Sequence, residues 1–337
     1  MRASVIVPAY NAEKTIGQCL DALADQTIGR SEYEIIVVDD GSNDATAEVV
    51  ARHQDIKSIK QGNAGPAAAR NNGVSQAEAP VIVFTDSDCV PQPDWLEKMI
   101  GPLEADPNVT AVKGAYRTKQ HQIAARFVQL EYEDKYDLLR KRENIDFVDT
   151  YSAAFRRDVF LQFKGYDTSF KVACAEDVEL SYRMHNAGHR MIFAPQALVY
   201  HLHPATLAAY FRKKFKFAYW RMLAVRKNPN KLVSDSHTPQ VMKLQLLLAP
   251  MIIALLLLGL FGRVFVYGSV FAALAFLLIS LPFTLKALAK DPVVGSLSPL
   301  ILLGRAAAQF AGVFRGLIDW YLVRKSKSTA DQRDNRI

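Results

Sequence analysis

Three groups of acidic side chains in this sequence have the types and spacing that chemistry on a phosphorylated ligand would need. They are Asp39-Asp40, Asp86-Ser87-Asp88 and Glu176-Asp177. Two carboxylates placed just beyond the end of a strand can converge on one cation, and hard oxygen ligands suit Mg²⁺ or Mn²⁺. A pocket lined by carboxylates needs such a cation to hold a diphosphate. The residues alone allow a second interpretation, in which Asp86 and Asp88 only cap a turn.

The first two acidic groups each follow a short apolar run, which predicts a buried strand. The predicted strands cover residues 5–7, 34–38, 56–59 and 81–84. Continuous β-branched runs are typical of strands covered on both faces, and their alternation with helical segments predicts an α/β domain with a parallel sheet. Ligands of such sheets bind beyond the carboxyl ends of the strands, where these acidic groups lie.

The segments between the strands predict helices at 11–23, with Asn11 as N-cap, at about 44–53 and at 66–74. The loop 61–66 leads into the third helix, which carries Arg70. Backbone amides of this loop or Arg70 could reach a bound ligand, or Arg70 could instead cap the sheet. Neither a GxGxxG motif nor a Walker lysine follows the first strand, which argues against dinucleotide oxidoreductases and P-loop NTPases. Residues 109–203 give a more irregular pattern.

The pair Glu176-Asp177 opens a predicted helix. Carboxylates are favoured there by the helix dipole, which is one sufficient explanation. The other is general-base catalysis, because a hydroxyl is a poor nucleophile unless a positioned carboxylate removes its proton.

The last third of the chain is strongly apolar. Residues 244–261 and 264–283 predict two transmembrane helices joined by a tight turn, and 293–323 predicts either a third span or an interfacial helix. The helix predicted for 207–226 is amphipathic and basic, and it fits either the membrane interface or an ordinary protein surface. The net charge is +7, with basic clusters on both sides of the apolar third, which favours an anionic membrane over nucleic acid.

These patterns predict four parts: a catalytic domain at 1–205, an interfacial helix and linker at 206–235, a membrane domain at 236–325 and a polar tail at 326–337. The three cysteines lie far apart and predict reduced thiols. No signal peptide precedes the first strand, and the basic flanks suit the positive-inside rule. We therefore expect a multi-pass protein of the inner (plasma) membrane with a cytoplasmic catalytic domain.

Five segments over residues 3–203 carry a family resemblance. They are Val5-Ile-Val-Pro-Ala-Tyr-Asn11, Val38-Asp-Asp-Gly-Ser42, Asn63-Ala-Gly-Pro-Ala-Ala-Ala-Arg-Asn71, Phe84-Thr-Asp-Ser-Asp88 and Ala175-Glu-Asp-Val-Glu-Leu180. Together they resemble glycosyltransferase family 2. The resemblance implies the GT-A fold of nucleotide-diphospho-sugar transferases, with a Rossmann-like, mostly parallel sheet, followed here by C-terminal transmembrane helices.

The resemblance also implies a function and a role for each residue. It implies an inverting, metal-dependent transfer of a sugar from a nucleotide-sugar donor, with UDP expected as the nucleotide. The acceptor would be a hydroxyl of a lipid-linked or other glycan at the cytoplasmic face of the membrane, in cell envelope polysaccharide synthesis. Donor contacts would come from Pro8, Ala9, Tyr10, Asp39, Asp40, Asn63, Arg70 and Asp86. Asp88 and Asp86 would bind Mn²⁺ or Mg²⁺, with His201 as a further ligand, and Asp177 would be the base beside Glu176.

The sequence departs from the family pattern at one motif, and two other functions remain as alternatives. Processive members of the family carry a Gln-x-x-Arg-Trp motif, which Phe215-Lys-Phe-Ala-Tyr-Trp220 does not match, so a single, non-processive transfer is expected. A polyprenyl-phosphate sugar synthase is one rival, although its anionic acceptor needs no base. A non-catalytic membrane adaptor is the other, and the intact acidic residues argue against it.

Overall fold

The structure is a computed structural model that describes residues 1–170, 174–231 and 239–323. The chain divides into two compact units. The first contains residues 1–119 and 136–202, and the second contains residues 120–135 and the chain from 203 onward. Residues 120–135, which fall within the range 1–205 expected for the catalytic domain, thus group with the second unit. The predicted tail at 326–337 and residues 232–235 at the end of the predicted linker lie outside the described residues.

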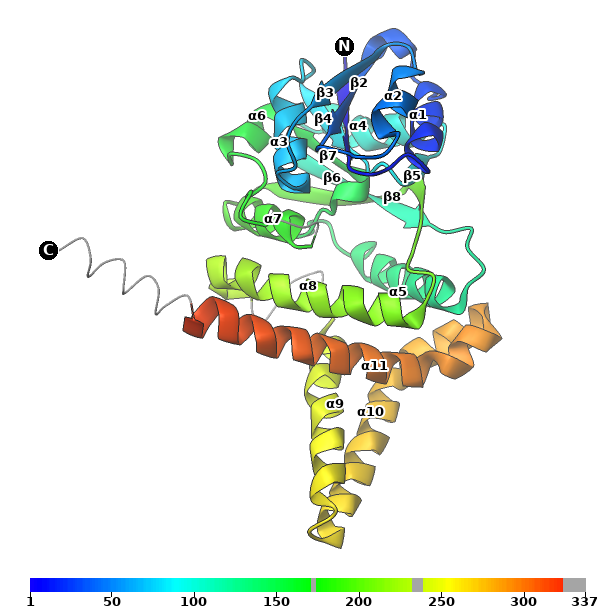
Figure 1. The fold of residues 1–337 in the computed structure, drawn as a ribbon, viewed down its shortest axis with the longest axis vertical. Helices are drawn as coiled ribbons and strands as arrows, with labels where there is room; N and C mark the ends of the chain where they lie inside the picture. The colour runs from blue at the N-terminus through cyan, green and yellow to red at the C-terminus, as the bar shows by residue number, and fades with distance from the viewer. Residues whose placement is uncertain (171–173, 232–238, 324–337) are drawn as a thin grey trace, which may run out of the picture. The chain divides into compact units, whose positions relative to one another are not determined.

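The first unit is built on one mixed eight-stranded sheet in the order β3-β2-β1-β4-β7-β6-β8-β5 (Figure 1). The strands are β1 (Ala3–Ala9), β2 (Tyr33–Asp39), β3 (Ile56–Lys60), β4 (Val81–Phe84), β5 (Cys89–Pro91), β6 (Val109–Arg117), β7 (Ala153–Arg156) and β8 (Arg190–His201). The helices are α1 (Ile16–Ala24), α2 (Thr46–Ala51), α3 (Pro66–Ser75), α4 (Trp95–Ala105), α6 (Arg157–Gln162) and α7 (Glu176–Asn186).

The amino-terminal half of this sheet is parallel, as the apolar runs predict. β1 lies between β2 and β4, and β2 also pairs with β3, all in parallel. All four residues of β4 are buried, and so are six of the seven in β1 and six of the seven in β2. The sheet therefore places the carboxyl ends of β1, β2 and β4 at one edge.

The other half of the sheet corrects the prediction of an irregular stretch at 109–203. β7 runs antiparallel to β4 and β6, β8 is parallel to β6, and β5 is antiparallel to β8. These strands were not predicted because Lys113 and Gly114 break the apolar pattern of β6, and because register shifts interrupt the pairing of β6 with β8.

The N-cap prediction at Asn11 is wrong, because α1 begins only at Ile16. Asn11 has a φ of 48°. Its backbone N–H donates to Ser42 Oγ at 3.0 Å, and its Oδ1 accepts from the backbone N–H of Asn43 at 2.9 Å. The side chain thus joins the segment after β1 to the segment after β2, and both segments belong to the predicted ligand edge.

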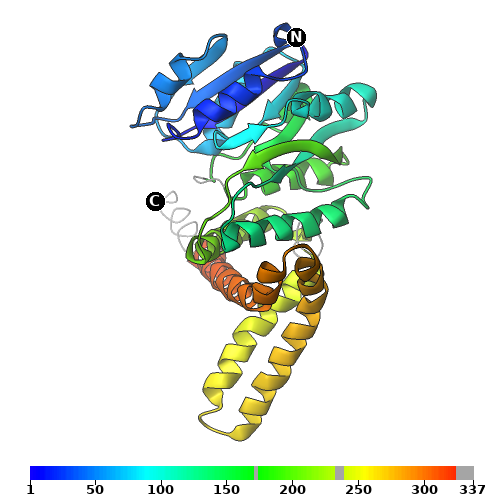
Figure 2. The same ribbon diagram turned by 90° about the vertical axis from the view of Figure 1, so that its right-hand side faces the viewer.

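The second unit is helical. Its elements are the first part of α5 (Ile123–Leu139), α8 (Leu207–Lys227), α9 (Gln240–Leu258), α10 (Arg263–Lys290) and α11 (Pro292–Leu317), which continues as a π-helical turn over Ile318–Val323. Both views show α9 and α10 side by side as a hairpin (Figures 1 and 2), and α11 runs along α8. The shared core includes Phe127, Tyr210, Phe276 and Ile301.

Three described helices are long and apolar enough to cross a membrane, namely α9, α10 and the segment Pro292–Tyr321. Their observed bounds differ from the predicted spans: α9 starts four residues before 244 and ends at Leu258, and α10 extends to Lys290. Many of their leucines are exposed in the protein alone, as expected for side chains that face lipid.

Candidate functional site

The predicted donor residues gather where β1, β2 and β4 end. Asp39 pairs in register with Ala9, and the backbone N–H of Asp40 donates to the carbonyl oxygen of Ala9 at 2.8 Å. Tyr10 follows directly and is 50% exposed. Asp86 lies two residues beyond the end of β4. The sheet therefore brings three separate motifs of the sequence to one edge.

Asp39 and Asp40 are adjacent, but their carboxylates have different partners. Both are buried, at 3% and 4% exposure. Asp40 accepts from Gln61 Nε2 and from the backbone N–H groups of Ala64 and Gly65 at 2.7 to 2.9 Å. Asp39 Oδ1 accepts only from the backbone N–H of Ser42, and its buried Oδ2 has no hydrogen-bond partner in the described structure. A buried acceptor without a partner is costly, and a ligand donor would satisfy it.

Asp40 therefore acts on the loop 61–65, which contains Asn63. The loop reaches the segment after β2 at Gly41, where φ is +79° and a Cβ would lie 3.0 Å from the backbone nitrogen of Asn63. Only glycine fits this close approach without strain. Asn63 itself is exposed at the tip of the loop. Of the predicted donor residues, Pro8 and Ala9 form the end of β1, so their backbone lines the same edge.

Arg70 lies in α3 and is 1% exposed. Its Nη2 donates to Asp86 Oδ1 at 2.7 Å and its Nη1 donates to Glu176 Oε1 at 2.9 Å. Although burial disfavours the charge, the two carboxylates raise the pKa of Arg70 above its usual range, so it stays charged. In the structure, Arg70 thus forms an internal bridge between the segment after β4 and the start of α7.

Glu176 and Asp177 differ in the same way as the first aspartate pair. Glu176 is 1% exposed, receives Arg70, and accepts from the backbone N–H groups of Cys174 and Ala175 at 3.0 and 3.1 Å. Asp177 accepts only from the backbone N–H of Val178 at 2.8 Å. Burial and the neighbouring Glu176 carboxylate raise the pKa of Asp177 to about 7. Asp177 thus has the proton affinity that a base working near neutral pH needs, whereas the Glu176 carboxylate is occupied by Arg70 and two backbone N–H groups.

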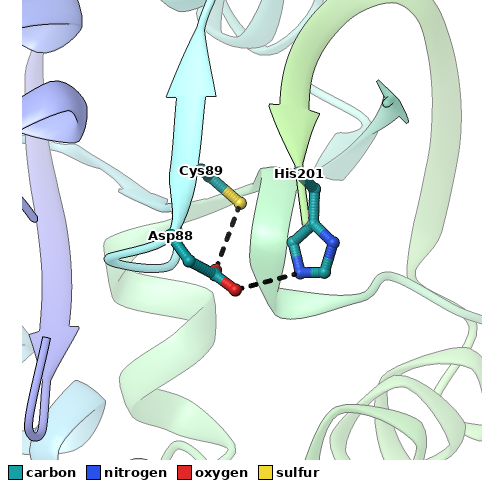
Figure 3. A group of neighbouring side chains, drawn as sticks. All are labelled: Asp88, Cys89 and His201. Carbon is teal, nitrogen blue, oxygen red and sulfur yellow. Dashed lines mark hydrogen bonds and ion pairs between the residues drawn. The ribbon is translucent and has the colours of Figure 1, made fainter. Parts of the chain in front are cut away.

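A second group lies at the junction of β5 and β8 (Figure 3). His201 Nε2 is 3.7 Å from Asp88 Oδ2, and Cys89 Sγ is 4.0 Å from Asp88 Oδ1. Cys89 pairs with His201 across the antiparallel strands, so both side chains lie on one face. The ring of His201 stacks on Tyr116 with centroids 5.2 Å apart. Within the described residues these three side chains offer ligand atoms within 4.8 Å of one another, and Asp86 is not among them.

Two residues of this region were missed by the sequence interpretation. Cys89 was taken only as a reduced thiol, and the antiparallel pairing of β5 with β8 that brings it beside His201 has no sequence signal. Lys113 is 2% exposed in β6, pairs with Asp149 and donates to the hydroxyl of Tyr151 at 3.1 Å. Its charge partly offsets the rise in the pKa of Asp177, so it belongs to the electrostatic surroundings of the predicted base.

Comparison with known proteins finds relatives among the glycosyltransferases. Glycosyltransferase AglE of Haloferax volcanii is 37% identical over 105 residues, covering 30% of this chain and 34% of that protein. Poly-beta-1,6-N-acetyl-D-glucosamine synthase of Staphylococcus aureus (strain COL) is 26% identical over 222 residues, covering 63% of this chain and 53% of that protein. The matched part thus spans a third to about half of these relatives.

A solved structure extends the likeness of the fold to nearly the whole chain. The mannosyltransferase PcManGT from Pyrobaculum calidifontis, solved in complex with GDP-Man and Mn2+, superposes with a TM-score of 0.63 and 24% identity, over 94% of this chain and 87% of that one. The fold is therefore that of the GT-A glycosyltransferases, followed by apolar helices. Residues 4–163 match the family Glycosyl transferase family 2, so this part of the chain is a domain of that family.

Proposed function

We propose that this protein is an inverting glycosyltransferase that moves a sugar from a nucleotide-sugar donor to an acceptor hydroxyl. The observation that carries the proposal is the contrast between Glu176 and Asp177. One carboxylate is locked by Arg70 and two amides, and its neighbour has a pKa of about 7. Arg70 links this pair to Asp86, so the proposed base and the proposed donor residues share one rigid framework.

The donor would bind at the edge formed by the ends of β1, β2 and β4. The unpartnered Asp39 Oδ2 would accept an N–H of the nucleobase, with Pro8, Ala9 and the exposed ring of Tyr10 beside the base. Asp40 would shape the loop that carries Asn63 rather than touch the nucleotide. Uracil and guanine both offer a ring N–H to such a carboxylate. UDP is the expected nucleotide, and the GDP-Man complex of PcManGT makes GDP donors the first alternative.

The residues at the β5–β8 junction fit a divalent cation. A carboxylate oxygen and an imidazole nitrogen 3.7 Å apart form a donor set that suits Mn²⁺, and Mg²⁺ is the alternative if oxygen ligands dominate. Asp88 and His201 would hold the ion. Asp86, which accepts a hydrogen bond from Arg70, would be near the ion but not among its direct ligands. Such an ion supplies charge neutralisation for the departing diphosphate.

The chain's own residues would perform one in-line displacement. Asp177 takes the proton from the acceptor hydroxyl as the hydroxyl oxygen forms its bond to the anomeric carbon. The bond from that carbon to the phosphate oxygen breaks, and the electron pair leaves with the nucleoside diphosphate. Because the base stands on the face opposite the leaving group, the anomeric configuration is inverted. Arg70 and Glu176 would keep Asp177 in place.

The acceptor and the location are also part of the proposal. Three helices long and apolar enough to cross a membrane support a membrane protein, and the basic residues of α8 support a cytoplasmic catalytic domain by the positive-inside rule. A hydroxyl on a lipid-linked glycan, or on another glycan at that surface, is the acceptor class that such a location favours. The stretch 215–220 of α8 lacks the motif of processive members, and for that reason we propose a single transfer per encounter.

The direct test is a donor screen with the purified full chain in neutral detergent. UDP-sugars and GDP-sugars are incubated with Mn²⁺ and with lipid extract as acceptor source, and release of nucleoside diphosphate is measured. We expect release from one nucleotide class, lost in Asp88→Asn and in EDTA. If no donor yields nucleoside diphosphate, the proposed function is refuted. If turnover is unchanged in EDTA, the proposed metal dependence is refuted.

A further inference from the structure

A polar cluster lies inside the helical second unit, where α5, α8 and α11 meet. Its centre is Glu131 of α5, which is 4% exposed. Glu131 accepts from Arg305 Nη1 at 2.6 Å, from the Tyr210 hydroxyl at 2.7 Å and pairs with Lys214 Nζ at 3.0 Å. The glutamate is therefore fully used, with two cations for one negative charge.

A third cation stands beside this group. Lys135 lies one helical turn after Glu131 on α5, over the ring of Tyr132 at 5.4 Å, and makes no ion pair within the described structure. Burial, together with the charges of Lys214 and Arg305, lowers the pKa of Lys135 to about 7. The cluster thus has three basic side chains and one acid, an imbalance that is costly away from bulk water.

Arg305 is only partly satisfied as well. It is 4% exposed, its Nη groups bind Glu131 and Gln245, and its buried Nε has no hydrogen-bond partner. An arginine with a donor left over beside surplus lysine charge is the arrangement that proteins use for phosphoryl oxygens.

The cluster sits at a defined level of the apolar hairpin. Gln245 lies near the start of α9, just before its apolar run, and donates to Ser280 Oγ of α10 at 2.8 Å. Ser280 follows the long apolar part of α10 and precedes the last turns of that helix, which carry Lys286 and Lys290. Buried polar residues that flank the apolar runs of two candidate spans indicate the boundary between hydrocarbon and headgroups. Figure 1 shows α8 and α11 running side by side along that end of the hairpin.

We propose that Lys135, Lys214 and Arg305 form a binding site for a phosphoryl anion, and that the anion is the headgroup of an anionic membrane lipid. The site consists of residues of the second unit, whereas the proposed donor and base residues belong to the first, and the proposal does not depend on glycosyl transfer. The lipid source is assigned because the site lies at the headgroup level of the candidate spans. A phosphomonoester headgroup suits the surplus of two positive charges.

The test measures lipid binding, not catalysis. The full chain in neutral detergent is titrated with phosphatidic acid and, separately, with phosphatidylcholine, and binding is followed by native mass spectrometry and by the shift in thermal unfolding. We expect saturable binding of phosphatidic acid only. Lys135→Gln should weaken it at least about 10-fold, and Lys135→Arg should preserve it, because the charge is kept.

Lys216→Gln is the matched control, since it removes one exposed positive charge from α8 and should change binding less than about twofold. Lys135→Gln removes an unpaired charge, so the lipid-free variant should unfold at no lower temperature than the wild type. Equal loss in both glutamine variants would show only diffuse attraction and overturn the site. Full displacement of the lipid by millimolar inorganic phosphate would overturn the assignment to a lipid.

Discussion

At the scale of single residues, the site is organised by two pairs of neighbouring acids whose members do different work. In each pair one carboxylate is saturated by the protein and the other is left with unused capacity. Asp40 and Glu176 accept three or more hydrogen bonds each, whereas Asp39 and Asp177 accept one each. The saturated members hold loops and helix starts in place, and the unsaturated members are available to a ligand.

The first pair gives a prediction that separates binding from stability. Asp39→Asn should weaken donor binding about 10- to 100-fold, because a charge-assisted hydrogen bond contributes about 1.5–3 kcal/mol. Asp40→Asn should instead destabilise the fold by about 1–3 kcal/mol, since it disturbs three hydrogen bonds of the loop 61–65. Donor titration and thermal unfolding of both variants check this. Equal donor affinity in Asp39→Asn and wild type would remove the residue from the donor site.

The second pair predicts that the stability of the protein depends on pH through Asp177, the proposed base. The pKa of Asp177 is raised in the folded protein, so the folded state holds its proton more tightly than the unfolded chain. The stability from this residue is therefore present at low pH and is lost as pH rises from about 4 to about 7. Asp177→Asn should stabilise the protein by about 1–2 kcal/mol at pH 8 and by less at pH 5.

Thermal unfolding of Asp177→Asn and wild type at both pH values tests this, with Glu176→Gln as comparison. Glu176→Gln should destabilise at both, because it weakens the buried contact with Arg70. A stabilisation by Asp177→Asn that is equal at pH 5 and pH 8 would contradict the raised pKa.

At the scale of elements, the sequence predicted the parallel half of the sheet because its strands are continuous apolar runs. It failed in the other half for physical reasons. Buried Lys113 and the register shifts of β6 with β8 break the apolar pattern, and antiparallel pairing between distant segments leaves no local signal. The site followed the same division. The acids after β2 and β4 were identified from the sequence, while the hydrogen bonds that distinguish Asp39 from Asp40, and the position of Cys89, required the fold.

The contact between α8 and α11 gives a prediction at this scale. Three glycines of α11 face the aromatic and methionine side of α8, and a Cβ on Gly312 would lie 2.3 Å from the carbonyl oxygen of Phe215. Gly312→Ala should therefore destabilise the second unit by about 1–3 kcal/mol through overpacking. Gly268→Ala is the control, because its Cβ would meet Leu255 at an ordinary 3.5 Å. Resistance to proteolysis and thermal unfolding of both variants would show whether the helices pack this closely.

At the scale of the whole molecule, the three apolar helices predict a membrane topology. The hairpin of α9 and α10 turns at Gly262, so reporter fusions after Gly262 and after Asp291 should report opposite sides, with Asp291 on the cytoplasmic side. Because α11 packs along α8, we expect α11 to lie in the membrane interface, and a fusion after Tyr321 should then report the same side as Asp291. If α11 instead crosses the membrane, the fusion after Tyr321 should report the opposite side. Signals from one side at Gly262 and Asp291 would refute the hairpin.

The most direct test of the central claim is the steady-state kinetics of Asp177→Asn with the donor identified by the screen. The substitution keeps the shape and removes the basicity. We predict that kcat falls by about 10²- to 10⁴-fold, the range for general-base assistance, while the dissociation constant of the donor stays within about twofold of wild type. Loss of donor binding in proportion to the loss of rate would place Asp177 in the donor site and contradict its role as the base.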